Sequence, residues 1–182
     1  MNILTLIPII LILGAYIPLI TAARRATSPV NIATFGLWIV TGVCVSAATY
    51  AAGGEIPYIG IGFVLANCVL VCALLSAHAW RWSHKETVAL GVAIGGLLVW
   101  YVSEPLYALI ALVAGNYLGA GMPTLIDAYR NPQRSQVLSW SLFSLAALIN
   151  CAVITNTTLE SYLYPVAALV FNSLVALANL KK

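Results

Sequence analysis

The sequence consists mainly of seven apolar runs that are separated by short polar segments. Each run is close to the roughly 17 to 25 residues that an α-helix needs to cross the hydrocarbon core of a membrane. With 62% hydrophobic and 7% charged residues, the chain has too little polar surface to fold around a core in water. We therefore predict an all-α membrane protein with seven transmembrane helices, at Ile3–Ala23, Val30–Ala52, Tyr58–Trp80, Thr87–Ser103, Leu106–Ala128, Val137–Ile154 and Leu159–Leu180.

The first and fifth runs contain the same short pattern, which indicates an internal repeat. Leu-Gly-Ala-x-x-Pro spans residues 13–18 and returns 105 residues later at residues 118–123. The same offset pairs Asn67 with Asn172 and leaves the fourth run without a counterpart. We predict two parallel three-helix repeats joined by a linker helix, a 3+1+3 arrangement. The first repeat covers residues 1–82, the linker 83–104 and the second repeat 105–182.

The distribution of charge predicts the orientation of the chain. All eight Lys and Arg residues follow the first, third, fifth and seventh predicted helices, and three glutamates lie in the loops of the opposite face. Because basic loops stay on the cytoplasmic side, we predict an outside N-terminus and a cytoplasmic C-terminus in the cell (inner) membrane. The basic residues are Arg24, Arg25, Arg81, Lys85, Arg130, Arg134, Lys181 and Lys182, and the glutamates are Glu55, Glu104 and Glu160.

Two prolines inside predicted helices are candidate hinges. A proline removes one backbone hydrogen bond and crowds the carbonyl group four residues earlier. For Pro18 that residue is Gly14, and for Pro123 it is Gly119. Kinks at equivalent places in two helices suit a pair of moving arms. A static kink that only shapes the bundle is the alternative.

Two asparagines are the leading candidates for solute binding. Asn67 and Asn172 lie well inside the third and seventh predicted helices, where an unpaired amide is costly. We expect them to face each other near the midplane, where transporters built from repeats hold their substrates. Hydrogen bonding between helices, without a ligand, is the alternative. Weaker candidates for the same cavity are Asn150, Asn116, Ser46 and Tyr50.

The apolar runs carry no Asp, Glu, Lys or Arg near their centres, which favours passive transport over ion coupling. No catalytic constellation, phosphate-binding glycine loop or metal-ligand cluster can be assembled, so we predict neither an enzyme nor a bound cofactor or metal. The few basic loop residues give no reason to expect a nucleic acid partner. The expected partners are a small-molecule solute and the lipid bilayer, and a homo-oligomer remains open.

The chain resembles the SWEET sugar transporters and the wider PQ-loop (MtN3-like) superfamily along its whole length. The resemblance rests on Pro18 and Pro123, on Asn67 and Asn172, and on basic segments that precede a serine at residues 24–28 and 130–135. It implies that the two asparagines bind sugar in a central cavity and that the two prolines let helices swing between inward-open and outward-open states. Alternatives are an amino-acid or vitamin transporter of the same fold, or a non-transporting receptor or accessory subunit.

Overall fold

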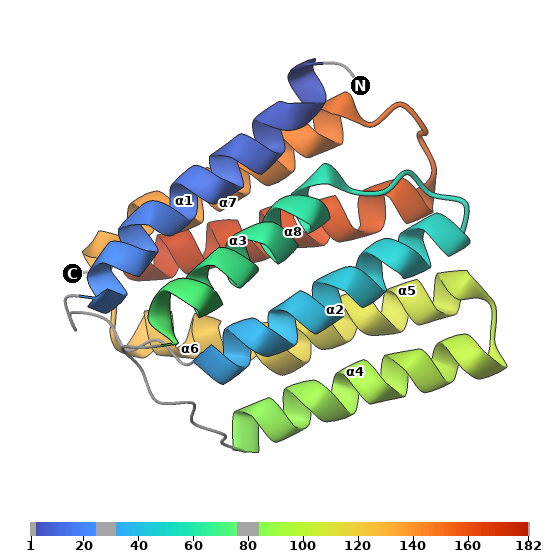
Figure 1. Cartoon of the computed structure of the whole chain (residues 1–182), viewed down its shortest axis with the longest axis horizontal. Helices are drawn as coiled ribbons and strands as arrows, with labels where there is room; N and C mark the ends of the chain where they lie inside the picture. The colour runs from blue at the N-terminus through green and yellow to red at the C-terminus, as the bar shows by residue number, and fades with distance from the viewer. Residues whose placement is uncertain (1–2, 25–31, 76–83, 182) are drawn as a thin grey trace.

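The computed structural model describes residues 3–24, 32–75 and 84–181. Within these ranges the regular structure is helical and no strand occurs, which confirms the all-α prediction. Seven helices are present in the described part of the chain (Figure 1). The fifth helix is continuous but changes type along its length. The elements are η1 Ile3–Leu6 with α1 Ile7–Arg24, α2 Ile32–Ala51, α3 Tyr58–Leu74, α4 His84–Val102, the fifth helix formed by α5 Pro105–Ala114, η2 Gly115–Gly121 and α6 Met122–Arg130, then α7 Arg134–Val153 and α8 Leu159–Asn179.

Proline and glycine mark several of the turns between helices. Pro57 precedes α3 and Pro105 is the first residue of α5, positions where the missing backbone N–H removes no helical hydrogen bond. Gly53, which follows α2, has a φ of 85°, a conformation that a residue without a side chain adopts readily. The predicted helix bounds agree with these elements to within a few residues. Residues 30–31 and 76–80 of the second and third predicted helices lie outside the described residues.

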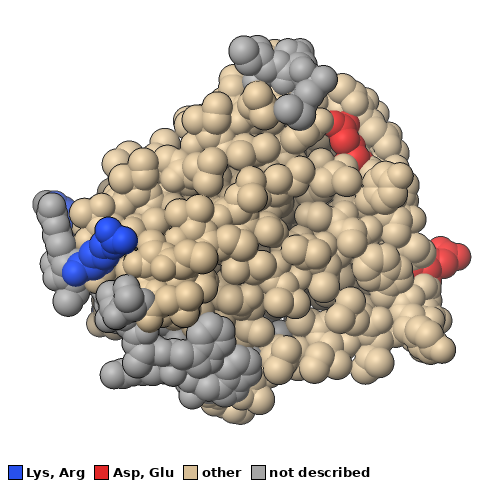
Figure 2. Space-filling view, in the orientation of Figure 1, with Lys and Arg blue, Asp and Glu red and all other residues tan. Residues whose placement is uncertain are grey.

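Within the described residues, five helical stretches are long and apolar enough to cross a membrane. The described parts of α3 and α4 are also apolar but contribute shorter stretches. Figure 2 shows a broad uncharged face with Lys and Arg at one end and Asp and Glu at the other. These features are typical of a multi-pass membrane protein. The five stretches are Leu4–Thr21, Ile32–Ala51, Pro105–Arg130, Arg134–Val153 and Leu159–Asn179.

Two sets of helices make matching contacts. In the N-terminal set, α1 to α3, the last helix packs against both of the others. In the C-terminal set, α5 to α8, the last helix packs against α7 and against the fifth helix. The two sets meet where α1 packs against α7 and α2 against α5, while α4 lies at the edge of the molecule against α2, α5 and η2 (Figure 1). Both sets therefore line the interior of the molecule.

Candidate functional site

Asn67 lies on α3 and is only 1% exposed. Its side-chain oxygen accepts a hydrogen bond from the hydroxyl group of Tyr16 on α1, another buried residue. A buried amide without a partner is costly, and this bond satisfies the oxygen within the N-terminal set. Tyr16 was not predicted from the sequence, although it lies inside the repeated pattern between Gly14 and Pro18.

Asn172 lies on α8, is 3% exposed and differs from Asn67 in its hydrogen bonding. Its amide nitrogen is buried and has no hydrogen-bond partner. Both asparagines are described, and no hydrogen bond joins their side chains. The interior therefore leaves this donor unsatisfied, as it does the amide nitrogen of Asn150.

The two asparagines have different aromatic residues at positions that correspond in the sequence. At the 105-residue offset, Tyr16 corresponds to Gly121 and Ala66 corresponds to Phe171. A Cβ atom on Gly121 would lie 2.9 Å from the ring of Phe171, which is closer than real side chains approach. At this pair of positions the C-terminal set carries its ring on α8 instead of the fifth helix. Phe171 brings no hydroxyl group that could donate to the oxygen of Asn172 as Tyr16 does to that of Asn67.

A row of aromatic rings joins the two sets beside these residues. Tyr16 lies 5.2 Å from Phe143 of α7, measured between ring centroids, and Phe143 lies 5.5 Å from Trp140. The row continues from Trp140 to Phe171 at 6.2 Å and from Phe171 to Tyr117 of η2 at 5.1 Å. These separations are those of ordinary aromatic pairs. The interior thus offers flat apolar surfaces next to a few amide and hydroxyl groups.

Asn150 and Asn116 connect the two sets instead of standing free. The side-chain oxygen of Asn150 on α7 accepts a hydrogen bond of 3.1 Å from the backbone N–H of Ile59, in the first turn of α3. Such N–H groups have no partner inside their own helix, so Asn150 satisfies one from the other set. Its amide nitrogen is buried and unpartnered. The oxygen of Asn116 in η2 accepts a bond of 3.0 Å from the hydroxyl group of Thr41 on α2.

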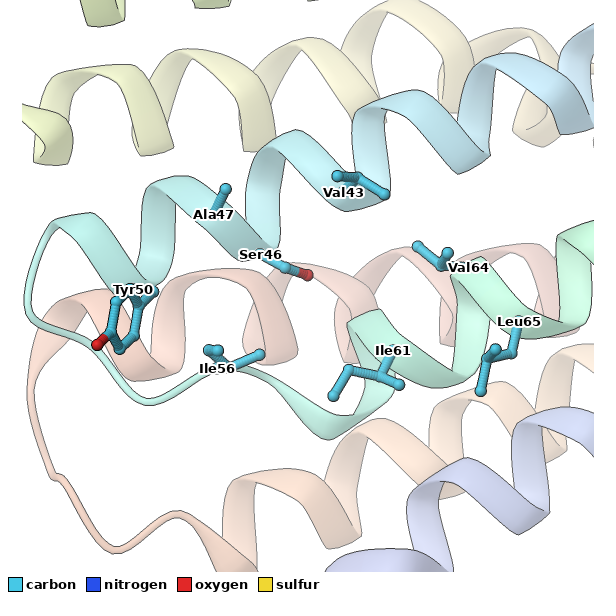
Figure 3. A pocket seen from close by; sticks show the side chains of 8 residues that line it. All are labelled: Val43, Ser46, Ala47, Tyr50, Ile56, Ile61, Val64 and Leu65. Carbon is cyan, nitrogen blue, oxygen red and sulfur yellow. The ribbon is translucent and has the colours of Figure 1, made fainter.

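Ser46 and Tyr50 line a groove between α2 and α3 whose lining includes neither Asn67 nor Asn172 (Figure 3). The groove has a volume of about 370 Å³ and an almost entirely apolar lining. Tyr50 is 70% exposed on the outside of the bundle. The hydroxyl oxygen of Ser46 is buried without a partner, close to Gly60. This groove is suited to the acyl chains of surrounding lipid.

The two candidate hinges lie in helices of different type. Pro18 lies inside the α-helix α1, and a Cβ atom added to Gly14 would meet nothing within 4 Å. Pro123 follows the π-helical segment η2, in which Gly119 lies; the surroundings of Gly119 are outside the described part of the chain. A π-helical turn widens the helix and is frequent at functional sites. Of the two prolines, only Pro123 therefore follows a widened, π-helical segment.

A hydrogen-bonded clasp, formed by residues 53–55 and 155–161, joins the two sets at the acidic end of the bundle. One carboxylate oxygen of Glu55 accepts bonds from the backbone N–H and the hydroxyl group of Thr155, both at 2.9 Å, and from the backbone N–H of Asn156 at 3.2 Å. The backbone N–H of Glu55 donates to the Ser161 hydroxyl at 2.8 Å, and the Asn156 amide donates to the carbonyl of Gly53 at 3.0 Å. From the sequence, Glu55 predicts only the orientation of the chain.

The clasp favours the ionised form of Glu55. Partial burial raises the pKa of this carboxyl group, but the hydrogen bonds from Thr155 and Asn156 outweigh it and leave the pKa below its ordinary value. Bonds from N–H and O–H donors to a carboxylate are stronger than bonds between neutral groups. The clasp is consequently at full strength near neutral pH.

Three contacts between described residues at the basic end of the bundle stay within one set. The Arg24 guanidinium donates to the carbonyl of Ala73 at 3.4 Å, inside the N-terminal set. In the C-terminal set the backbone N–H of Gln133 donates to the Asn179 side chain at 2.7 Å. The ammonium of Lys181 lies 3.3 Å from the centre of the Tyr129 ring. These contacts brace each set without tying it to the other.

The chain matches none of the known protein families, curated proteins or solved structures with which it was compared.

Proposed function

We propose that this protein is a SWEET-like membrane facilitator that moves a small neutral or zwitterionic solute, a sugar above all, by alternating access between two three-helix repeats. The observation that carries the proposal is the buried amide of Asn172, which lacks a partner at the position equivalent to Asn67. Such a group is costly unless something satisfies it in the working protein. A solute between the repeats would supply that partner.

The matching contacts of the two sets support the repeat assignment. Each repeat would consist of a pair of helices that pack against its third helix, α3 or α8, and the contact of α1 with α7 would have its counterpart in the contact of the fifth helix with α2. A rotation that exchanges the repeats about an axis along the membrane normal relates these pairs. Movement between two such bodies is the usual route to alternating access.

The clasp supports a conformation closed at the acidic end, which the charge distribution predicts to be the outer face. The hydrogen bonds that Glu55 accepts tie the two sets together, whereas the described contacts of Arg24 and Lys181 at the basic end do not. The buried polar residues carry only hydroxyl or amide groups, chemistry that suits a solute without net charge. They are Thr41, Thr49, Asn67, Ser139, Asn150, Ser161, Asn172 and Asn179.

A thermal-shift screen of the purified protein in detergent tests the proposal, because a ligand that binds only the folded state raises its stability. The panel contains mono- and disaccharides, amino acids and small vitamins. We expect at least one class to raise the melting temperature of the wild type but not of Asn67→Ala or Asn172→Ala. Asn131→Ala is the matched control, since this exposed asparagine bonds only to Asp127 among the described residues. Equal shifts in all four proteins would contradict the proposal.

One observation favours a receptor or accessory subunit as a second candidate. The rings of Tyr16, Phe143, Trp140 and Phe171 already fill the interior between the sets, so the fold is held together without a solute. Flux of a bound solute into proteoliposomes separates the two functions. A facilitator equilibrates the solute across the membrane, whereas a receptor binds it without flux.

A further inference from the structure

We infer that Tyr16 is a positioning residue that fixes the amide of Asn67, so that both asparagines of the proposed site offer N–H groups and the solute must supply hydrogen-bond acceptors. The inference rests on the proposed function and deepens it by naming the chemistry of the substrate. It selects neutral solutes that are rich in hydroxyl, ether or carbonyl oxygens.

The first step concerns the direction of the Asn67 amide. A side-chain amide has one oxygen, which accepts, and one nitrogen, which donates twice. Tyr16 donates its hydroxyl hydrogen to the oxygen of Asn67. The Tyr16 ring lies 5.2 Å from Phe143 and 6.4 Å from Phe35 between ring centroids and is buried, so it cannot readily swing away. With its oxygen held, Asn67 has its N–H groups left for a solute.

The second step concerns Asn172. Its nitrogen is the atom that lacks a partner, so this side chain also has donors to offer. Gly121 stands at the position equivalent to Tyr16 and supplies no hydroxyl that could hold the amide the other way round. An oxygen atom of the solute would satisfy these donors. An ammonium or other donor group at the same place would face N–H against N–H and leave both unpaired.

The third step is specificity. A site that donates hydrogen bonds rejects an analogue that lacks the matching acceptor, because the buried donors then stay unsatisfied. Fluorine accepts a weak hydrogen bond and cannot donate one, whereas a deoxy position does neither. Substitution of single hydroxyl groups of a sugar by fluorine or hydrogen therefore reports which partner the protein provides at each position.

The experiment measures the affinity of glucose and its single deoxy and deoxyfluoro analogues for the wild type, Tyr16→Phe and Asn67→Ala. In the wild type we expect fluorine to be tolerated better than hydrogen at the positions that contact the amides. Tyr16→Phe keeps the ring and removes the hydroxyl, so the Asn67 amide becomes free to turn its oxygen to the solute. At one position the affinity ratio of the hydroxyl to the fluoro compound should then rise roughly fivefold. Tyr107→Phe, on the exposed side of α5, is the matched control.

A second measurement observes the two side-chain amides directly by NMR. In protein labelled with ¹⁵N at asparagine side chains, the Asn67 and Asn172 amide signals are identified by their loss in Asn67→Gln and Asn172→Gln. We expect both signals to shift when glucose is added, and the Asn67 signal to move in Tyr16→Phe while that of Asn131 stays.

The outcomes separate the inference from the proposed function. If glucose binds, Asn67→Ala abolishes binding and Tyr16→Phe leaves every ratio unchanged, the inference is overturned and the function stands. If both amide signals stay still while glucose binds, the inference is likewise overturned. If no member of the series binds the wild type, the assignment of a sugar as solute falls together with the inference.

Discussion

The N-terminal and C-terminal sets fill equivalent space with different residues. Tyr16 on α1 stands where the C-terminal set has Gly121, and Ala66 on α3 stands where it has Phe171. The aromatic residue of this pair of positions lies on α1 in one set and on α8 in the other, and only the ring on α1 carries a hydroxyl group. The two sets therefore differ in polar chemistry at positions 105 residues apart. The difference teaches that a shared sequence pattern does not give Asn67 and Asn172 the same hydrogen-bond partners.

The first and fifth helices differ in a second respect. Pro18 is accommodated inside the α-helix α1, whereas Pro123 follows the π-helical segment Gly115–Gly121. Three of the seven residues of that segment are glycines, which tolerate the wider turn. A π-helical turn has looser hydrogen bonding than an α-helix. The two prolines therefore stand in helices of different geometry.

The largest effect on stability is expected from removing the Phe171 ring. Phe171→Ala deletes a buried side chain that contacts Tyr117 and Trp140 and should lower the free energy of unfolding by about 3–5 kcal/mol. Adding Gly121→Tyr recreates the arrangement of the N-terminal set and should recover part of the loss. Gly121→Tyr alone should destabilise, because its Cβ atom meets the Phe171 ring at 2.9 Å. Thermal unfolding of the three variants measures the coupling, and additive losses would show that the two rings are not interchangeable.

Replacement by leucine should lower the stability of the protein at Asn67 but not at Asn172. Asn67→Leu leaves the Tyr16 hydroxyl buried without a partner and should cost about 1–3 kcal/mol in stability. Asn172→Leu removes an amide nitrogen that already lacks a partner, so the variant should be as stable as the wild type or more so. Thermal unfolding without solute measures both. Equal losses would show that Asn172 has a protein partner after all. A stable Asn172→Leu protein that binds no solute would place this residue in a site where function is maintained at the expense of stability.

The clasp gives a prediction about pH. The pKa of Glu55 is lowered in the folded state, chiefly because the hydrogen bonds of Thr155 and Asn156 outweigh the effect of burial. A lowered pKa means that the stabilisation is complete above the ordinary glutamate pKa of about 4.3 and is lost as the pH falls through the folded-state value. Glu55→Gln should be less stable than the wild type at neutral pH by about 0.5–1.5 kcal/mol, the scale of one net hydrogen bond.

Unfolding curves between neutral and strongly acidic pH test the clasp. The difference between wild type and Glu55→Gln should shrink as the pH falls below about 4.3. A difference that is constant over the whole range would mean that Glu55 acts through packing and not through its charge. In proteoliposomes, a clasp that closes the acidic end should hold back solute entry from that side, and Glu55→Gln should raise the entry rate.

The helices could be predicted from the sequence, but the facing of their side chains could not. Runs such as Leu159–Leu180 are apolar over the length of a membrane crossing, and that length predicts a transmembrane helix. Lipid and protein interior are both apolar, however, so hydrophobicity does not show which side of a membrane helix turns inward. This is why Tyr50, expected near the asparagines, lies on an exposed groove. The bond between Tyr16 and Asn67 depends on how α1 and α3 are rotated, and no spacing along the chain records it.

The smallest effect is expected at Gly14, and it separates a moving hinge from a static kink. A Cβ atom there would meet nothing within 4 Å, so Gly14→Ala should stabilise α1 by about 0.5–1 kcal/mol through better helix propensity. If α1 bends at this point during transport, the stiffer helix should slow solute flux while solute affinity stays unchanged. If the kink is static, flux and affinity should both equal those of the wild type. Because the fifth helix contains the π-helical segment, bending could be confined to that arm. Normal flux in Gly14→Ala together with slowed flux in Pro123→Ala would assign the movement to the fifth helix, so that the chemical asymmetry of the two halves would extend to their motion.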